Sequence, residues 1–458
     1  MTPVSPDLNA LRHTFQSGIT RSHAFRQQQL RALARALQAR EKAIYEALGN
    51  DLQKNPEEAW VTENGFVLAE IHHTLRCLQK WMEPEPVHTN FLNLPASSKI
   101  YQEPKGVVLI IGPWNYPLQL LLTPLIGAIA AGNCVVIKPS EFAPATAALI
   151  QEIIAACFPA DYIVCLQGEG AAMIPPLIRS FRFDHIFYTG STAVGKLIYQ
   201  LAAEQLIPVT LELGGKSPCI IEADANIRVA ARRIVQTKFS NAGQMCVAPD
   251  YVLVHQSIKA ALVEELVHWI QKFYGDAMES SGYYGKIVNE KQFDRLLGYL
   301  SQGRLIFGGR HDRSRLFIEP TLMDQVNSND PVMQEEIFGP ILPVLSFENP
   351  EAARNIILRH PDPLALYVFT RDMRKAENWL QSIPSGGACI NNPSWHLTNP
   401  NLPFGGRGNS GIGSYHGKNS FDAFSHQKAV MRTPNWFDPA IKYPPLKGKL
   451  SIFKRIIR

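Results

Sequence analysis

The residues best suited to chemistry lie in two segments near the middle of the chain. The segment Thr210–Lys216 places Glu212 inside an apolar run, just before a double glycine. Burial raises the pKa of a carboxyl group, which would bring Glu212 toward the range of a useful general base. The segment Asn241–Pro249 carries Cys246, whose thiolate would be stabilised at a helix or turn start. Taken singly, each also fits a structural role: a strand-end glutamate in a salt bridge, or a buried cysteine.

Two further polar segments each follow a β-rich run. Asn115 lies in the turn Gly112–Pro117, where its side chain can donate a hydrogen bond to a developing oxyanion. Lys138 and Glu141 follow the next run and can both reach the hydroxyls of a ribose. Alone, the first segment is a Pro-rich turn capped by an asparagine, and the second is an ordinary surface turn.

A glycine-bearing segment, Gly190–Leu197, connects a β-rich run to a helical stretch. This arrangement points backbone N–H groups and a helix N-terminus at a phosphate. The segment fits GxxxxGK, but Leu197 stands where a P-loop needs the Ser or Thr that holds magnesium. The segment therefore favours a phosphate-bearing cofactor over a nucleoside triphosphate. A purely structural strand-to-helix turn is the alternative.

The elements that must position these residues follow a regular alternation. Leucine and isoleucine recur on one helix face within the first 80 residues, which predicts a helical start. After it, short β-rich runs alternate with helix-length stretches such as 143–157 and 191–204. This pattern predicts a parallel, doubly wound sheet that binds ligands at the carboxyl ends of its strands. The predicted strands are 106–112, 134–138, 162–167, 184–189 and 209–213.

The alternation restarts after Gly215 and predicts a second α/β unit, so that an active site can lie between two domains. Its predicted strands are 219–221, 251–254, 341–346, 366–370 and 388–391. Two strand-like stretches, 91–102 and 421–431, belong to neither unit and suggest a small third element. The apolar stretch 118–137 contains glutamine, proline and glycines, which predicts a buried helix, a turn and a buried strand and not a membrane span.

Composition excludes several classes of protein. The chain has 458 residues, of which 46% are hydrophobic and 19% charged, as in a folded globular protein. Six of the charges behind the formal net charge of +5 lie between Lys442 and Arg458, where no acidic residue stands, so the other 441 residues carry −1. The body is therefore not a nucleic-acid-binding surface. Apolar residues interleave with the basic ones in this tail and predict a short amphipathic helix.

Cysteine and histidine usage points to a reducing compartment and to no metal site. The seven cysteines are scattered without a CxxC pair, which indicates free thiols in the cytosol. The N-terminal residues lack the charged start and apolar run of a secretory signal. The histidines show no metal-ligand spacing, so we expect no metal.

Taken together and in this order, the segments resemble the aldehyde dehydrogenase superfamily. The segments described above are joined in this resemblance by EEIFGP at 335–340 and PFGG at 403–406. The likeness runs from about residue 10 to about residue 435. The stretch SGIGSYHG at 410–417, followed by Ser420 and Phe421, is similar to the class 3 branch, which includes fatty aldehyde dehydrogenases and whose members are typically dimers.

The resemblance implies a role for each residue of the set. Cys246 is the nucleophile, the side chain of Asn115 and the backbone N–H of Cys246 hold the oxyanion, and Glu212 deprotonates the water that hydrolyses a thioester. The implied cofactor is NAD, with NADP also accepted. By similarity, the cofactor-binding residues are Trp114, Lys138, Glu141, Gly190, Ser191, Gly195, Leu213, Gly214, Glu336 and Phe338.

The resemblance also implies the organisation of the chain. We expect a Rossmann-like doubly wound cofactor domain at 1–84 and 106–213, and a second α/β catalytic domain at 214–417. A small β oligomerisation element takes 85–105 and 418–436, and a basic amphipathic tail takes 437–458. The tail can contact an anionic membrane surface, the substrate entrance or a dimer partner.

The expected activity is the NAD(P)-dependent oxidation of a medium- or long-chain aliphatic or an aromatic aldehyde to its acid. We expect a cytoplasmic homodimer with no nucleic-acid partner. Met245 and the stretch 395–401 are expected to line the aldehyde pocket. Two alternatives remain: a nucleotide hydrolase built on Gly190–Lys196, and an inactive NAD-binding scaffold.

Overall fold

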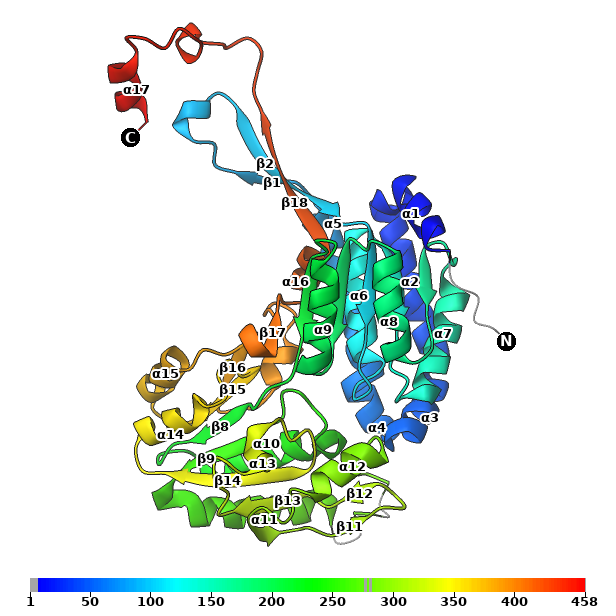
Figure 1. Ribbon diagram of the computed structural model, residues 1–458, viewed down its shortest axis with the longest axis vertical. Helices are drawn as coiled ribbons and strands as arrows, with labels where there is room; N and C mark the ends of the chain where they lie inside the picture. Colours follow the sequence, from blue (N-terminus) through cyan, green and yellow to red (C-terminus); the bar gives the residue numbers. More distant parts are fainter. Residues whose placement is uncertain (1–6, 276–277, 280–281, 458) are drawn as a thin grey trace.

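A computed structural model describes residues 7–275, 278–279 and 282–457 of the chain. Two large sheets, each packed against helices, form two domains, and a narrow three-stranded sheet projects from them as an arm (Figure 1). The predicted mixed α/β class, with two α/β units, is thereby confirmed.

The first domain contains a six-stranded sheet with the strand order β17-β7-β6-β3-β4-β5. β3 to β7 are mutually parallel, and the short β17 pairs antiparallel with β7. Side chains of β3 and β4 are wholly buried, as expected for apolar runs covered by helices on both faces. The strands are β3 (Val107–Ile111), β4 (Cys134–Lys138), β5 (Ile163–Cys165), β6 (His185–Thr189), β7 (Val209–Glu212) and β17 (Gly411–Ile412).

The helices of this domain include the helical start that the leucine periodicity predicts. They are α1 (Leu8–Gln16), α2 (His23–Ala39), α3 (Glu41–Leu52), α4 (Pro56–Ala59), α5 (Gly65–Met82), α6 (Gln119–Ala131), α7 (Pro144–Cys157), α8 (Gly170–Ser180) and α9 (Thr192–Ala203). Every residue of α6 is buried, and β4 follows it, which confirms the buried helix and strand predicted for 118–137. Among the described residues, no helix is long and apolar enough to cross a membrane.

Strand order places a ligand site beside β3. The chain runs from β3 outward through β4 and β5, and then returns to the other side of β3 as β6 and β7. The crevice outside the carboxyl ends of β3 and β6 is therefore a topological switch point, where open α/β sheets bind ligands. Asn115 follows β3, Gly190 follows β6 and Glu212 ends β7.

The second domain contains a seven-stranded sheet with the order β10-β13-β14-β9-β8-β15-β16, parallel except for β10. Its strands are β8 (Pro218–Ile221), β9 (Tyr251–His255), β10 (Arg304–Phe307), β13 (Thr321–Asp324), β14 (Ile341–Phe347), β15 (Ala365–Phe369) and β16 (Gly387–Ile390), with a separate pair β11 (His311–Asp312) and β12 (Phe317–Ile318). Its helices are α10 (Ile227–Phe239), α11 (Lys259–Tyr274), α12 (Glu290–Leu297), α13 (Pro331–Gln334), α14 (Pro350–Ile357) and α15 (Met373–Ser382).

The arm pairs segments from opposite ends of the chain. It has the order β1-β2-β18, formed by β1 (Glu85–Val87), β2 (Ser97–Pro104) and β18 (Ser425–Arg432). The strand predicted at 421–431 is wrong at its start, because α16 (Lys418–Ala423) occupies that part. Phe421 is buried there against Trp81 of the first domain, so its apolar character serves a helix contact. Similarly, Phe91–Asn93 form a 3-10 turn before β2 begins.

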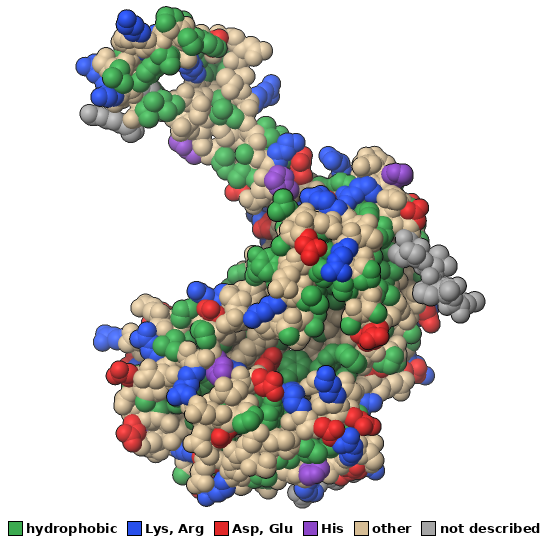
Figure 2. Space-filling model, in the orientation of Figure 1, with side chains coloured by type: hydrophobic (Ala, Val, Ile, Leu, Met, Phe, Trp, Pro, Cys, Tyr) green, Lys and Arg blue, Asp and Glu red, His purple; other side chains and the backbone are tan. Residues whose placement is uncertain are grey.

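The C-terminal tail continues beyond the arm. It ends in a short helix, α17 (Leu450–Ile456), which confirms the predicted helical segment; Arg458 lies outside the described residues. α17 lies at the far end of the arm, away from both sheet domains (Figure 1). Lys, Arg and apolar side chains stand next to one another at this tip (Figure 2). The tail of this protomer therefore does not cover its own interdomain cleft.

Candidate active site

Two hollows meet at Cys246. The first, here called the cleft, lies between the two sheet domains and is lined from the carboxyl ends of β3, β6 and β7; the surface is visibly hollowed there (Figure 2). The second, here called the apolar pocket, is lined from η2 (Trp60–Asn64), α6, α10 and η6 (Trp395–Thr398). Among the described residues, four line both hollows: Leu120, Cys246, Phe404 and Tyr415. A group attached to Cys246 can therefore face both hollows at once.

Backbone strain marks the segment that presents Cys246. Asn241 and Ala242 both adopt positive φ, at 50° and 51°, although neither is a glycine. Gly243 follows with φ of 73°, and a Cβ there would strike the carbonyl of Gly339. Such conformations cost free energy and persist where the surrounding structure enforces them. The turn before Cys246 is thus held in one unusual conformation.

The electrostatic surroundings of Cys246 differ from those that its sequence position suggests. Burial raises the pKa of the thiol, and the carboxylates of Glu336 and Glu212 raise it further. Backbone N–H groups of the turn lower the pKa, as expected for a turn start, but they do not outweigh burial. The expectation of a stabilised thiolate is therefore wrong for the protein alone, because burial and two nearby acidic groups all disfavour the charged form.

Glu212 is buried at the end of β7, with 3% of its surface exposed. Neither of its carboxylate oxygens has a hydrogen-bond partner among the described residues. Burial raises its pKa well above the ordinary 4.5, which confirms the effect predicted from its apolar run. A carboxylate left without partners in the interior costs stability, and such groups mark functional sites.

Asn115 connects the cofactor domain to the segment that carries the cysteine. Its side-chain Nδ2 donates to the carbonyl of Gln244 at 3.0 Å, two residues before Cys246. Its own carbonyl accepts from the side chain of Asn241 at 2.9 Å. The amide is buried, with 3% exposed, and lines the cleft. The structure thus brings together Cys246, Glu212 and Asn115, which the sequence distributes over 130 positions.

Seven of the ten predicted cofactor residues line the cleft: Trp114, Gly190, Ser191, Leu213, Gly214, Glu336 and Phe338. Ser191 is the N-cap of α9, so a helix N-terminus opens into the cleft. The rings of Trp114 and Phe338 meet edge-on, with centroids 5.3 Å apart. A Cβ at Gly214 would strike the carboxylate of Glu336, so a larger residue there would displace that carboxyl group.

The other three predicted residues do not line the cleft. Lys138 and Glu141 form an ion pair with each other, and Glu141 also accepts from the backbone N–H of Gly170 at 2.9 Å. Gly195 is packed against Leu213. Lys196, which a P-loop would aim at a phosphate, is exposed on α9 and does not line the cleft either, which counts against a nucleotide hydrolase.

A buried ion pair holds the loop that carries Glu336 and Phe338. Lys216 pairs with Asp250 and donates to the carbonyls of Val332 and Glu335, at 3.0 and 2.9 Å. Asp250 in turn accepts from the backbone N–H of Ile337 at 2.9 Å. Neither member can be recognised from the sequence, because the two residues lie 34 positions apart and no motif or spacing connects them.

The same loop is held from a second side. Arg295, on α12, donates to the carbonyls of Glu336 and Ile337 at 3.2 and 2.7 Å. Burial raises the pKa of Glu336 to about 8. Glu336 therefore presents a carboxyl group in a fixed place, with a proton whose loss falls near neutral pH.

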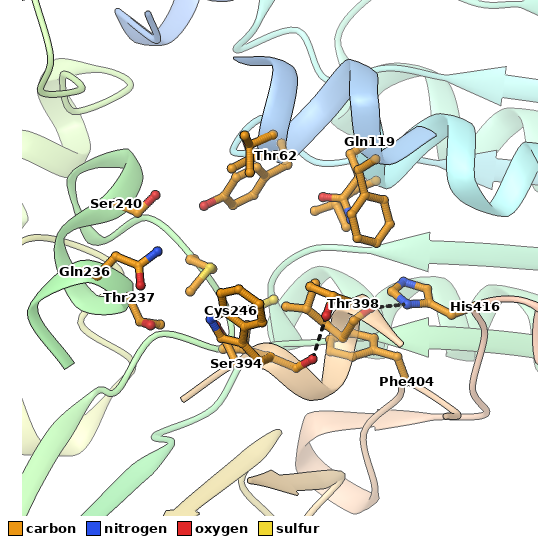
Figure 3. A pocket seen from close by; sticks show the side chains of 18 of the residues that line it. Thr62, Gln119, Gln236, Thr237, Ser240, Cys246, Ser394, Thr398, Phe404 and His416 are labelled. Carbon is orange, nitrogen blue, oxygen red and sulfur yellow. Dashed lines mark hydrogen bonds between the residues drawn. The ribbon is translucent and has the colours of Figure 1, made fainter. Parts of the chain in front are cut away.

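The walls of the apolar pocket carry no charged side chain among the described residues. Figure 3 shows side chains converging on Cys246 from η2 and α6, from α10, and from the chain around η6. Met245 lines this pocket, as do Trp395, Leu397 and Thr398 of the stretch 395–401; that the pocket takes the aldehyde stays a prediction. His416 also lines the wall, and burial lowers its pKa to about 4, so its ring is neutral. Val61 and Trp395, 69% and 53% exposed, mark the outer part of the pocket.

The fold and the cleft define a two-domain, dinucleotide-binding enzyme. A helix N-terminus suits a pyrophosphate, the Glu336 carboxyl group suits a ribose hydroxyl, and Phe338 and Trp114 offer apolar surface to a nicotinamide ring. Among the described residues, no cluster of His, Cys, Asp and Glu fits a metal ion.

Comparison with known proteins gives the family. The aldehyde dehydrogenase family profile matches residues 9–430. The chain is 45% identical over 446 residues to 4,4'-diaponeurosporen-aldehyde dehydrogenase of Staphylococcus aureus, covering 97% of both chains. It is 42% identical to the dimeric NADP-preferring aldehyde dehydrogenase of Rattus norvegicus, covering 98% of this chain and 99% of that one. The solved structure of substrate-bound Staphylococcus aureus AldH superposes with a TM-score of 0.96, at 44% identity and 98% coverage of both chains.

The chain therefore belongs to the aldehyde dehydrogenase family, and its similarity to dimeric and family 3 members is consistent with the class 3 branch. It is an enzyme that oxidises aldehydes to carboxylic acids with NAD(P). An indole-3-acetaldehyde dehydrogenase solved with NAD⁺ shares the fold, with a TM-score of 0.84 at 29% identity, 93% coverage of this chain and 88% of that one.

Proposed function

We propose that Cys246 captures the aldehyde covalently and that Glu212 releases the product as the free acid. The observation that carries this is the position of Cys246 at the junction of the two hollows, beside a buried carboxylate without partners. The apolar pocket delivers the aldehyde, and the cleft holds NAD(P). The roles of Trp114, Lys138, Glu141 and the other cofactor residues, Gly195 included, are part of this proposal.

The first half of the reaction builds and oxidises an adduct on sulfur. The thiolate of Cys246 attacks the carbonyl carbon, forming a C–S bond and an oxyanion that the Asn115 side chain and the Cys246 backbone N–H stabilise. A bound nicotinamide supplies the hydride acceptor. Loss of hydride from the former carbonyl carbon leaves an acyl thioester on Cys246.

The second half hydrolyses this thioester. Glu212 takes a proton from a water molecule, the hydroxide attacks the thioester carbonyl, and the C–S bond breaks to release the carboxylic acid and restore the thiolate. A raised pKa suits Glu212 to this step, because a stronger base abstracts the proton of water more readily. Because Glu212 supplies a carboxylate whose oxygens are free to take a proton from water, the acyl group is expected to pass to water.

The test is NADH formation from NAD and a panel of short and long, aliphatic and aromatic aldehydes. We expect turnover by the native protein, and none by Cys246→Ala, which should still bind NAD. If the native protein forms no NADH with any aldehyde, the proposal fails. The inactive-scaffold alternative predicts NAD binding with no NADH at all.

The apolar pocket favours a medium- or long-chain or an aromatic aldehyde. Its wall is uncharged, so a charged aldehyde would lose hydration without gaining a partner. The relative from Staphylococcus aureus is named for 4,4'-diaponeurosporen-aldehyde, and we propose that this chain also takes an apolar substrate.

We propose a cytoplasmic homodimer in which the arm makes the contact between subunits. Apolar side chains are exposed along the arm, such as Phe91 at 75% and Met431 at 51%. The rat relative is named dimeric. Free cysteines are compatible with a reducing compartment. Light scattering of the native protein should give twice the mass of 51.1 kDa; a monomer would contradict the proposal.

We propose peripheral membrane contact for the tail. Lys442, Lys447, Lys449, Lys454 and Arg455 stand beside exposed apolar side chains, including Leu450, Ile452 and Ile457. Such a segment binds anionic lipid through charge and apolar burial together. The full chain should sediment with anionic vesicles more strongly than a chain ending at Trp436. Equal sedimentation of the two proteins would remove the proposal.

A further inference from the structure

Beneath the catalytic turn lies an ion pair that no sequence pattern indicates. Lys54 follows α3, Glu63 lies in the π-helical turn η2, and the side chains of both have no exposed surface. Lys54 Nζ lies 2.6 Å from Glu63 Oε1. Neither side chain lines the cleft or the apolar pocket, so neither can touch substrate or cofactor.

The pair makes hydrogen bonds to the main chain at both ends of the turn between β3 and α6. Lys54 Nζ donates to the carbonyl of Asn115 at 3.0 Å and stands 3.9 Å from the centre of the Tyr116 ring. Glu63 Oε2 accepts from the backbone N–H groups of Leu118 and Gln119, at 3.1 and 2.8 Å. The residues so fixed include the oxyanion donor and two residues of the apolar pocket wall, Tyr116 and Gln119.

Burial of such a pair is expensive, and it rarely stabilises a fold more than apolar side chains of the same volume would. What the pair supplies is a fixed position for the main chain. Lys54 Nζ donates to one main-chain carbonyl, and Glu63 Oε2 accepts from two main-chain N–H groups. An oxyanion donor must be held in a fixed position, because its stabilisation of the oxyanion changes when the donor shifts by tenths of an ångström. The pair Lys216–Asp250 has the same design beneath the Glu336 loop.

We propose that Lys54 and Glu63 are positioning residues for the oxyanion site, acting through Asn115. The proposal rests on the proposed role of Asn115 and extends it to the residues that aim its amide. Replacing Lys54 should therefore weaken stabilisation of the oxyanion at Cys246 without changing any group that touches the substrate.

A reaction that needs the oxyanion site but neither NAD nor an aldehyde separates this proposal from the proposed function. In 4-nitrophenyl acetate, the ester carbonyl is attacked by the Cys246 thiolate. A C–S bond forms, the tetrahedral oxyanion collapses, and 4-nitrophenolate leaves with the electron pair of the broken C–O bond. The burst of nitrophenolate measures this acylation. If the native protein acylates but makes no NADH from aldehydes, the proposed function fails while the present test still stands.

The experiment is a double-mutant cycle on the burst rate, using the full chain. Removal of an oxyanion donor costs about 100- to 1,000-fold, so we expect Asn115→Ala to approach this loss and Lys54→Met to lose about 10-fold or more. Because both act at one site, Lys54→Met should change the rate of the Asn115→Ala protein less than about 2-fold. A matched control is Lys259→Met, which breaks an ion pair with Asp324 away from the site and should keep the native burst rate.

Several results would overturn the proposal. One is an equal loss from Lys54→Met in the native and the Asn115→Ala proteins, which would show independent action. Another is a native burst rate in Lys54→Met. Should that protein not fold, Glu63→Gln preserves side-chain volume and one acceptor oxygen, and it must show the same non-additivity with Asn115→Ala. Thermal unfolding of every variant identifies the folded ones.

Discussion

Two buried glutamates, Glu212 close to Cys246 and Glu63 beneath the turn that carries Asn115, differ in what surrounds them. Glu63 has both oxygens occupied, by Lys54 and by two backbone N–H groups. Glu212 has no partner on either oxygen among the described residues. Burial raises the pKa of both, but the partners of Glu63 oppose that shift, whereas burial alone is resolved for Glu212.

The difference distinguishes a carboxylate that holds the structure of the site from one that is available for acid–base chemistry. A buried carboxylate whose oxygens all accept hydrogen bonds is held in one position, and its oxygens are not available to a water molecule. One without partners is held at a cost in stability, with its oxygens free for a water molecule and a proton. The contrast supports the proposed roles, a structural one for Glu63 and acid–base chemistry for Glu212, although both are glutamates buried to almost the same extent.

The largest expected effect is on stability, and its sign should differ between the two. Glu63→Gln removes the counter-charge of a buried lysine and should lower the free energy of unfolding by about 3–5 kcal/mol. Glu212→Gln removes an ionisable group whose raised pKa disfavours the folded state, and should raise that free energy by about 1–3 kcal/mol at neutral pH. Chemical denaturation of the two variants and the native protein measures both. A loss of stability in both variants would break the comparison.

The stability gained by Glu212→Gln should depend on pH. Because the folded-state pKa of Glu212 lies above the ordinary 4.5, the folded protein keeps a proton that the unfolded chain releases. The native protein thus loses stability as pH rises from about 4.5 through that raised pKa. Denaturation across pH 4–8 should show the variant and the native protein converging at the acid end. A gap that stays constant would show that Glu212 carries no raised pKa.

A smaller effect concerns the aldehyde. Each methylene that enters the apolar pocket should contribute up to about 0.8 kcal/mol, about 4-fold in kcat/KM, until the chain passes Val61 and Trp395 toward solvent. An aldehyde of equal length with a terminal carboxylate should lose this gain, because no cation lines the wall in the described part of the chain. A series of kcat/KM values measures both trends. Equal values for the apolar and carboxylate-tailed substrates would contradict the proposed substrate class.

Much of this architecture is predictable from the residues. β4 falls where the sequence predicts it. Cys246, Glu212 and Asn115 are recognisable from the motifs around them, and their roles in catalysis stay predictions. The sequence predicts a strand where α16 ends, because Phe421 packs against a distant helix and local pattern does not show that contact. The spacing of Lys54 and Glu63 in the sequence does not predict their ion pair either, because that contact depends on a π-helical turn. The raised pKa of Cys246 is hidden from local pattern for a related reason, since it depends on burial and on carboxylates brought close only by folding.

The central claim, that Glu212 serves hydrolysis and not capture, is tested most directly by rapid mixing of Glu212→Gln with NAD and an aldehyde. The account predicts a burst of about one NADH per subunit, followed by turnover that is lower than native by about 100- to 10,000-fold. Intact mass after mixing should show an acyl group on the protein, and Cys246→Ala should show neither burst nor acyl group. Absence of the burst in Glu212→Gln, or native steady-state turnover, would contradict the account.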